Sequence, residues 1–166
     1  MLINKLVKAQ PFSLFRLLYL RRKIKIIMEN RTNQSIRKMR KNDVTKTFFE
    51  TMKKVRQRNP LATQNDVIEQ AVKSEAPRFY VTFENARRYI SLMARKKQIP
   101  IVNKNKLEMY KEIYRRYIKR IRETSEHYRF VILERIIEEP APSFYLDEET
   151  FKGIVYKTLR ERRAIA

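Results

Sequence analysis

Apolar residues recur at helical spacing in six stretches of this chain, and capping or breaking residues bound each stretch. In the first half, the pattern predicts helices over residues 43–58, 64–76 and 83–97. Asn42 or Asp43 can cap the first of these helices, and Thr63 with Asp66 resembles a capping box at the second. Thr82 is the expected cap of the third helix.

The second half of the chain follows the same plan. A long amphipathic stripe over residues 107–121 predicts a first helix that carries several tyrosines. Thr124 or Ser125 is the expected cap of the next helix, which Pro140 and Pro142 end. Asp147 is the expected cap of the last helix. The chain therefore has two sets of three predicted helices.

Two hexapeptides reveal an internal duplication. Residues 76–81 read Ala-Pro-Arg-Phe-Tyr-Val, and residues 141–146 read Ala-Pro-Ser-Phe-Tyr-Leu, at an offset of 65 residues that extends around them without a gap. A fixed-offset match of this kind marks a repeated supersecondary unit. We therefore predict an all-α fold of two tandem trihelical modules, residues 42–99 (repeat one) and 100–166 (repeat two), preceded by a basic N-terminal helix or arm over residues 1–41.

The repeated hexapeptides, which we call the corner segments, each join a second helix to a third. Their prolines end the second helix, and the aromatic residues that follow can bury their rings between helices. We expect Phe79, Tyr80, Phe144 and Tyr145 to belong to the core. The alternative is that these rings are exposed and stack on the bases of a single strand, so their exposure distinguishes the two interpretations.

Composition excludes several kinds of chemistry. The single glycine argues against a β-rich fold and against phosphate-cradling loops, which need residues with positive φ. The absence of cysteine excludes disulfides, zinc fingers and thiol nucleophiles, and the single histidine, His127, cannot form a multi-histidine metal site. The acids Asp147, Glu148 and Glu149 are expected at a helix start, where the macrodipole favours them. We expect no enzymatic activity, no cofactor and no metal.

A strong positive charge points to polyanionic partners. The chain has 39 Lys and Arg against 18 Asp and Glu, a net charge of +21, of which residues 1–41 carry +11. At this charge, nucleic acid and anionic membrane surfaces are the default partners. The apolar stretch Phe12–Leu20 is interrupted by Arg16 and is shorter than the ~20 residues of a transmembrane helix, so no transmembrane segment is expected.

The leader over residues 1–27 is basic and has no acid, and three interpretations compete for it. It could be a basic amphipathic helix on a membrane or nucleic acid, or an organelle presequence. The third interpretation is that translation starts at Met28, which would lower the net charge to +14. In that case residues 29–41 form a polar, basic and frayed arm.

Helical geometry of about 100° per residue places basic residues opposite or beside the apolar faces of the third helices and of the long helix in repeat two. A support helix, a corner and a basic last helix have the outline of a helix-turn-helix. The segment before each third helix is, however, longer than the usual turn of about three or four residues and has no glycine. We predict helix-turn-helix-like modules with these nucleic-acid-binding residues: Arg78, Arg87, Arg88, Arg95, Lys96, Lys97, Arg115, Lys119, Arg122, Lys152, Lys157, Arg160 and Arg163.

Both corner segments, together with Met109–Arg116 (Met-Tyr-Lys-Glu-Ile-Tyr-Arg-Arg), resemble small basic helical proteins of Bacteroides-type gut bacteria and of their phages and mobile elements. The resemblance spans roughly residues 45–163 and leaves the leader outside. It implies a bacterial or phage setting and a cytoplasmic location. No activity is established for that group, so the resemblance implies no functional residues.

We predict a non-enzymatic nucleic-acid-binding protein, with DNA favoured over RNA, that contacts phosphates through the basic faces of its third helices. The alternative is a structural or interaction protein of a phage or mobile element that self-associates through helix faces such as the tyrosine stripe Tyr110, Tyr114 and Tyr117. A third hypothesis, a membrane-surface protein, depends on the leader.

Overall fold

The computed structural model describes the backbone of residues 12–101, 103–124 and 129–165 and the side chains of residues 33–101, 103–124 and 129–164. All regular structure within these residues is helical, which confirms the all-α prediction. The six helices are α1 (Phe12–Arg58), α2 (Gln64–Val72), α3 (Phe83–Ala94), α4 (Lys104–Glu123), α5 (Arg129–Glu138) and α6 (Glu148–Ile165). Their positions in the sequence follow the apolar pattern, with the first helix much longer than expected.

Helix α1 runs unbroken from Phe12 to Arg58, through the residues predicted to be a frayed arm and through the expected caps Asn42 and Asp43. The reason is local, because no proline or glycine lies between Pro11 and Pro60. The chain divides into two compact units, residues 1–35 and 36–166, and α1 contributes to both. Residues 1–11 of the leader lie outside the described residues, as do His127 and the alternative cap Ser125.

Short polar side chains start α2, α3 and α6 where the sequence predicted them, whereas Thr124, an expected cap of the fifth helix, ends α4 instead. The Thr63 hydroxyl accepts a hydrogen bond from the Asp66 amide at 3.3 Å, and the Asp66 carboxylate accepts one from the Thr63 amide at 2.8 Å. Thr82 accepts from the Asn85 amide at 3.3 Å, and Asp147 accepts from the Thr150 amide at 2.7 Å. These caps satisfy amides that lack partners within the helix. The sequence therefore determines the helix starts locally.

The two corner segments meet and bind each other. Ala76 and Ala141 exchange two backbone hydrogen bonds, each of 2.9 Å, in an antiparallel bridge. The Phe79 ring stacks on Tyr145 with centroids 6.2 Å apart, and the Tyr80 ring stacks on Phe144 at 5.9 Å. Each phenylalanine thus pairs with the tyrosine of the other repeat, which is the pattern of a pseudo-twofold axis.

The rings of the corner segments belong to the core. Phe79 is 1% exposed and Phe144 is 2% exposed, while both tyrosines are half-buried. Burial of this kind leaves no free face on either phenylalanine for a base. The core prediction is confirmed, and stacking of these phenylalanines on nucleic-acid bases is excluded.

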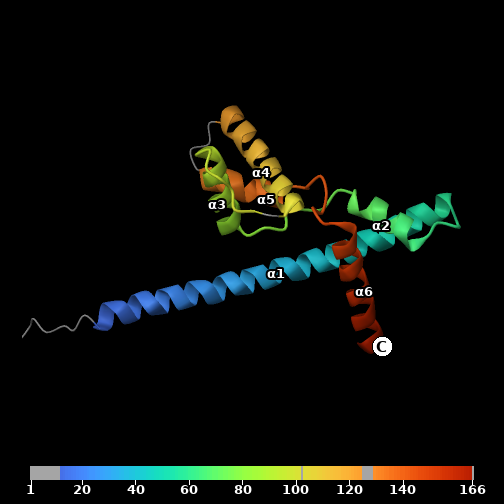
Figure 1. Cartoon of the computed structure of the whole chain (residues 1–166), viewed down its shortest axis with the longest axis horizontal. Helices are drawn as coiled ribbons and strands as arrows, with labels where there is room; N and C mark the ends of the chain where they lie inside the picture. Colours follow the sequence, from blue (N-terminus) through green and yellow to red (C-terminus); the bar gives the residue numbers. More distant parts are fainter. Residues whose placement is uncertain (1–11, 102, 125–128, 166) are drawn as a thin grey trace, which may run out of the picture. The chain divides into compact units, whose positions relative to one another are not determined.

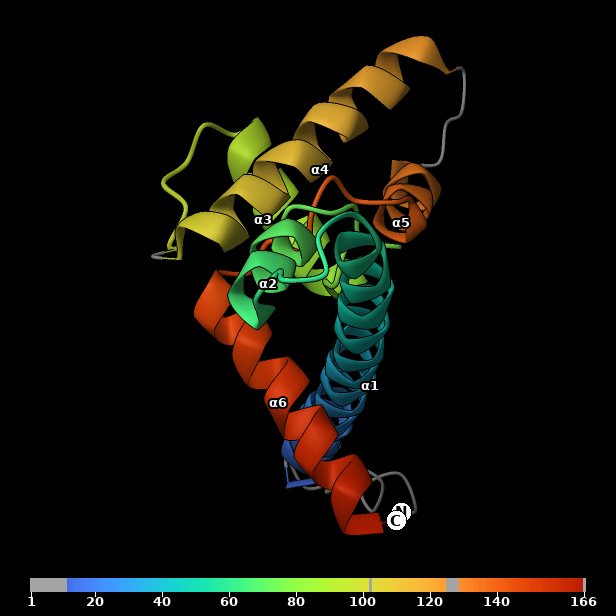
Figure 2. The ribbon, with the colours of Figure 1, turned by 90° about the vertical axis from the view of Figure 1, so that its right-hand side faces the viewer.

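The third helices pack across the pseudo-twofold axis. Helix α3 of repeat one packs against α4 and α5 of repeat two, and α6 of repeat two packs against α2 of repeat one. Figure 1 shows α3, α4 and α5 gathered together, and Figure 2 shows α6 running beside α2. Contacts of α6 outside repeat two include an ion pair from Glu161 to Lys41, the residue of α1 just before repeat one, and a hydrogen bond of 2.9 Å from the Tyr156 hydroxyl to Gln64 of α2.

This exchange differs from the prediction of two tandem modules. Residues 36–166 form one compact unit with one hydrophobic core, and the expected boundary at residues 99 and 100 falls between α3 and α4, which pack against each other. Each third helix packs against helices of the other repeat, so α3 does not lie on α2 as it would in a helix-turn-helix. Repeat one and repeat two are sequence units, and neither is a separate module.

Helix α3 ends in a left-handed turn at Lys96, whose φ is 52°. The Lys97 amide donates to the Leu92 carbonyl at 3.0 Å across this turn, a bond that stabilises the end of the helix. Glycine is the residue that adopts positive φ without steric cost, and here the position holds lysine.

We expect Lys96→Gly to raise the free energy of unfolding by about 0.5–1 kcal/mol, because it relieves the left-handed strain at the end of α3. Urea denaturation followed by circular dichroism measures the change. Lys97→Gly is the matched control, since no positive φ is present there, and it should destabilise the protein. A loss of stability in Lys96→Gly would contradict the assigned turn.

Candidate nucleic-acid interface

Three of the predicted binding residues are held in ion pairs within the fold. Arg115 binds Glu112 through two hydrogen bonds of 2.7 Å, and Lys119 lies 3.8 Å from Glu123. Arg78 pairs with Glu138 at the end of α5, and its side chain is 19% exposed. Arg78 therefore joins a corner segment to α5, and its charge is already compensated.

Arg116 on α4 is a structural residue that sequence reasoning missed. Its guanidinium carbon lies 5.1 Å from the centroid of the Phe79 ring, and its Nη1 donates to the Pro140 carbonyl at 2.8 Å. Glu112 and Glu139 accept further hydrogen bonds from it. Arg116 thus joins the corner segment of repeat one to the residues just before that of repeat two, and only its spacing of four residues from Glu112 was visible in the sequence.

Glu112 neutralises the basic face of α4 near Arg116. Hydrogen bonds from Arg115 and then Arg116 hold the pKa of the Glu112 carboxyl below its ordinary value, against the opposing effect of partial burial. A carboxyl with a lowered pKa in the folded state stabilises the fold above its unfolded pKa. That stabilisation disappears as the pH falls through the folded pKa.

We expect Glu112→Gln to lower the free energy of unfolding by about 1 kcal/mol at pH 7, because it removes the charged partner of two arginines. The difference from the parent protein should shrink as the pH falls below the ordinary glutamate pKa of about 4.3. Urea denaturation between pH 7 and pH 3 measures both effects. A difference that does not change over this range would contradict the ion-pair assignment.

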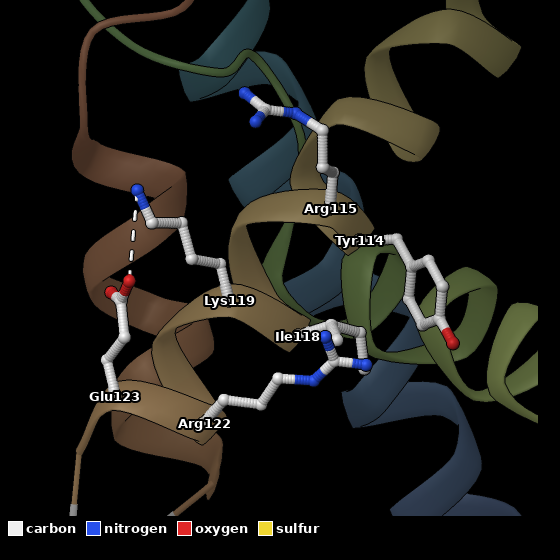
Figure 3. A pocket seen from close by; sticks show the side chains of 6 residues that line it. All are labelled: Tyr114, Arg115, Ile118, Lys119, Arg122 and Glu123. Atoms are coloured by element: carbon white, nitrogen blue, oxygen red, sulfur yellow. Dashed lines mark ion pairs between the residues drawn. The ribbon is translucent and has the colours of Figure 1, made fainter.

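An open hollow follows α4 beside these pairs (Figure 3), lined by Tyr114, Arg115, Ile118, Lys119, Arg122 and Glu123. The Lys119–Glu123 pair lies on one side, while Arg122 extends its side chain alongside Ile118. Of the three basic residues predicted on this helix, Arg122 alone forms no ion pair with a described residue. Two of the three basic residues predicted on α4, Arg115 and Lys119, are therefore compensated by acids of the same helix.

Helix α3 and the residues just after it carry uncompensated positive charge. Arg87, Arg95, Lys96 and Lys97 are exposed and form no ion pair with any described residue. Arg88 is exposed as well, with its guanidinium carbon 5.8 Å from the centroid of the Tyr89 ring. The helix macrodipole also favours basic side chains near a helix C-terminus, and this accounts for part of the placement of Arg95, Lys96 and Lys97. Their charge nevertheless remains available to a ligand.

Helix α6 carries a second set. Lys157, Arg160 and Arg163 are exposed, Lys152 is half-buried, and none forms an ion pair with a described residue. The exposed Arg162 was missed by the sequence analysis and belongs to the same set. Glu161 lies among them, but Lys41 from α1 already pairs with it, and their contact lowers the pKa of the Glu161 carboxyl. The acid within the set is thus compensated by another helix.

The repeat offset of 65 residues relates the two sets. Arg87 corresponds to Lys152, Arg95 to Arg160, and Lys97 to Arg162. The offset was the signal that could have identified Arg162. We name the ten basic residues of the two sets the third-helix cations: Arg87, Arg88, Arg95, Lys96, Lys97, Lys152, Lys157, Arg160, Arg162 and Arg163.

The structure offers no competing kind of site in the residues it describes. No group of histidine or acidic side chains among them could hold a metal ion. None of the described helices is long and apolar enough to cross a membrane. No protein-family model, curated protein or solved structure matches the chain, so no family assignment adds to the geometry.

Proposed function

We propose that this chain is a non-enzymatic nucleic-acid-binding protein, with DNA favoured over RNA, and that the third-helix cations contact backbone phosphates. The observation that carries the proposal is the contrast between the two kinds of basic residue. Arg78, Arg115 and Lys119 are compensated by carboxylates, whereas the third-helix cations form no ion pair with a described residue. Residues 36–166 have 31 basic against 17 acidic side chains, so a positive excess remains after pairing.

The contacts proposed here are electrostatic and carry no base readout. Lysine and arginine that neutralise phosphates release counterions, so affinity falls steeply as salt rises. A bacterial or phage cytoplasm, which the sequence resemblance implies, contains DNA that is accessible to such a protein. The proposed role is therefore binding with little sequence preference.

Titration of fluorescent duplex DNA at several salt concentrations tests this proposal. If about six phosphates are neutralised, log K should fall by roughly five for a tenfold rise in salt. Duplex RNA of the same length and single-stranded DNA are the comparison ligands, and DNA should bind more tightly than RNA. Affinity that does not change with salt, or no binding at low salt, would refute the proposal.

The alternative, self-association through exposed helix faces, has little support from the side chains that the structure describes. Tyr110 of the tyrosine stripe is 1% exposed and packs on Tyr89 with ring centroids 4.3 Å apart. Tyr114 and Tyr117 are half-buried. Among the described side chains, the most exposed large apolar ones are Leu61 and Phe130, which lie on different elements of the fold. The geometry therefore favours nucleic-acid binding.

A further inference from the structure

The contacts between the repeats are those of two partners that recognise each other. The third helix of each repeat packs against helices of the other repeat. The two corner segments form reciprocal hydrogen bonds and ring contacts with each other. In homodimers related by a twofold axis, the same arrangement joins separate polypeptides. Here one connection, the residues between α3 and α4, joins the two partners covalently.

We propose that this pairing surface also accepts a second copy of the chain, so that repeat one of each chain pairs with repeat two of the other in a helix-exchanged dimer. All contacts between the repeats can form in such a dimer, because none requires that the partners share a polypeptide. Only the α3–α4 connection changes, from a turn that folds α4 back on α3 to a link between two repeat pairs. That connection acts as the hinge.

Two features of the hinge favour opening. Lys96 holds a left-handed backbone conformation that is strained for lysine, and extension of the connection releases this strain. Buried apolar contacts join the helices on the two sides of the hinge, since Tyr89 on α3 packs against the buried Tyr110 on α4. A second chain can form the same contacts, so the stabilisation that opening of the hinge removes is recovered when the dimer forms.

The consequence for the proposed function is avidity. A helix-exchanged dimer carries two complete pairs of third helices, and linked binding sites on one polyanion raise the overall affinity. This consequence rests on the proposed nucleic-acid binding, whereas the exchange itself does not. The test below measures mass and needs no ligand.

The test replaces residues 96–101 in the full chain by Glu-Ala-Ala-Ala-Lys-Ala. These strong helix formers join α3 and α4 into one rod, so that α4 cannot fold back on the α3 of its own chain. We expect a dimer of twice the 20.3 kDa chain mass, with unchanged helix content by circular dichroism. The matched control replaces the same six residues by alternating glycine and serine, which permit the turn, and its main species should be the monomer.

A folded monomer with the helical linker would overturn the proposal. A second experiment covers failure of that variant to fold. A protease site is inserted after Gln98 in the otherwise unchanged chain, and two isotopically distinct preparations are folded, cleaved, mixed, unfolded and refolded. Native mass spectrometry should then find about half of the fragment pairs to be hybrids. Free fragments, or pairs of two identical fragments in place of hybrids, would also overturn the proposal.

Discussion

Phe79→Ala should lower the free energy of unfolding by about 3–5 kcal/mol, the usual cost of removing a fully buried phenylalanine. Phe79 is 1% exposed, stacks on Tyr145 and lies beneath the Arg116 guanidinium. Domains of this size have a total stability of only about 5–15 kcal/mol, so the variant should be close to unfolding. Urea denaturation followed at 222 nm measures the loss.

The same experiment tests the coupling of the repeats. Because Phe79 belongs to repeat one and its ring partner belongs to repeat two, both repeats should lose structure in a single transition. Leu61→Ala, at a position that is 90% exposed, is the control and should change stability by about 0.5 kcal/mol or less. Two separate transitions in the Phe79 variant, with one repeat unaffected, would contradict the shared core.

Neutralisation of four third-helix cations should weaken DNA binding by roughly ten-thousandfold at 0.1 M salt, since each lost phosphate contact costs about tenfold there. The variant changes Arg95, Lys97, Arg160 and Arg162 to glutamine, so that both third helices lose the same two equivalent positions. The slope of log K against log salt should become less steep by roughly three to four. Anisotropy titration with duplex DNA measures both quantities.

The matched control removes the same charge from residues that already have carboxylate partners. Lys46, Lys73, Lys111 and Lys119 each lie near a glutamate one helical turn away, and all four change to glutamine. This control should bind nearly as tightly as the parent protein. If both quadruple variants lose the same affinity, net charge governs binding, and the third-helix cations are not a distinct interface.

The helices and their caps were predictable because their causes are local. Thr63, Thr82 and Asp147 cap the helices that the sequence assigned to them. The side chain of such a cap accepts a hydrogen bond from an amide in the first turn of the helix, so the interaction depends only on neighbouring residues. The buried positions Ile90 and Val155 also lie where the period placed them. Local spacing was sufficient for the elements and for the faces they bury.

The exchange of third helices was not predictable from the same pattern. Ile90 of α3 and Val155 of α6 are equivalent apolar positions in the two repeats. The helical periodicity of apolar residues therefore does not show which set of helices each third helix packs against. The choice depends on contacts between residues far apart in the chain, such as Lys41 with Glu161 and Tyr89 with Tyr110. No spacing rule within one helix encodes these contacts.

The candidate interface was predictable only as a class. Helical geometry found most of the exposed cations of the third helices, but it could not show that Arg78 is compensated by Glu138, which lies 60 residues along the chain. It also missed Arg162, although its counterpart Lys97 was identified. Compensation between elements, as for Arg78, is a tertiary property, and it helps to decide which basic residues remain available to a ligand.

Exchange of the third helices is the central structural claim, and zero-length carbodiimide crosslinking of the unmodified protein tests it most directly. The reagent joins a lysine to a carboxylate that it already contacts, and the structure pairs Lys41 on α1 with Glu161 on α6. Mass spectrometry of peptides from the monomer fraction should show the Lys41–Glu161 link within one chain. If α6 lay on the helices of its own repeat, this link would be absent from the monomer, and that result would contradict the account.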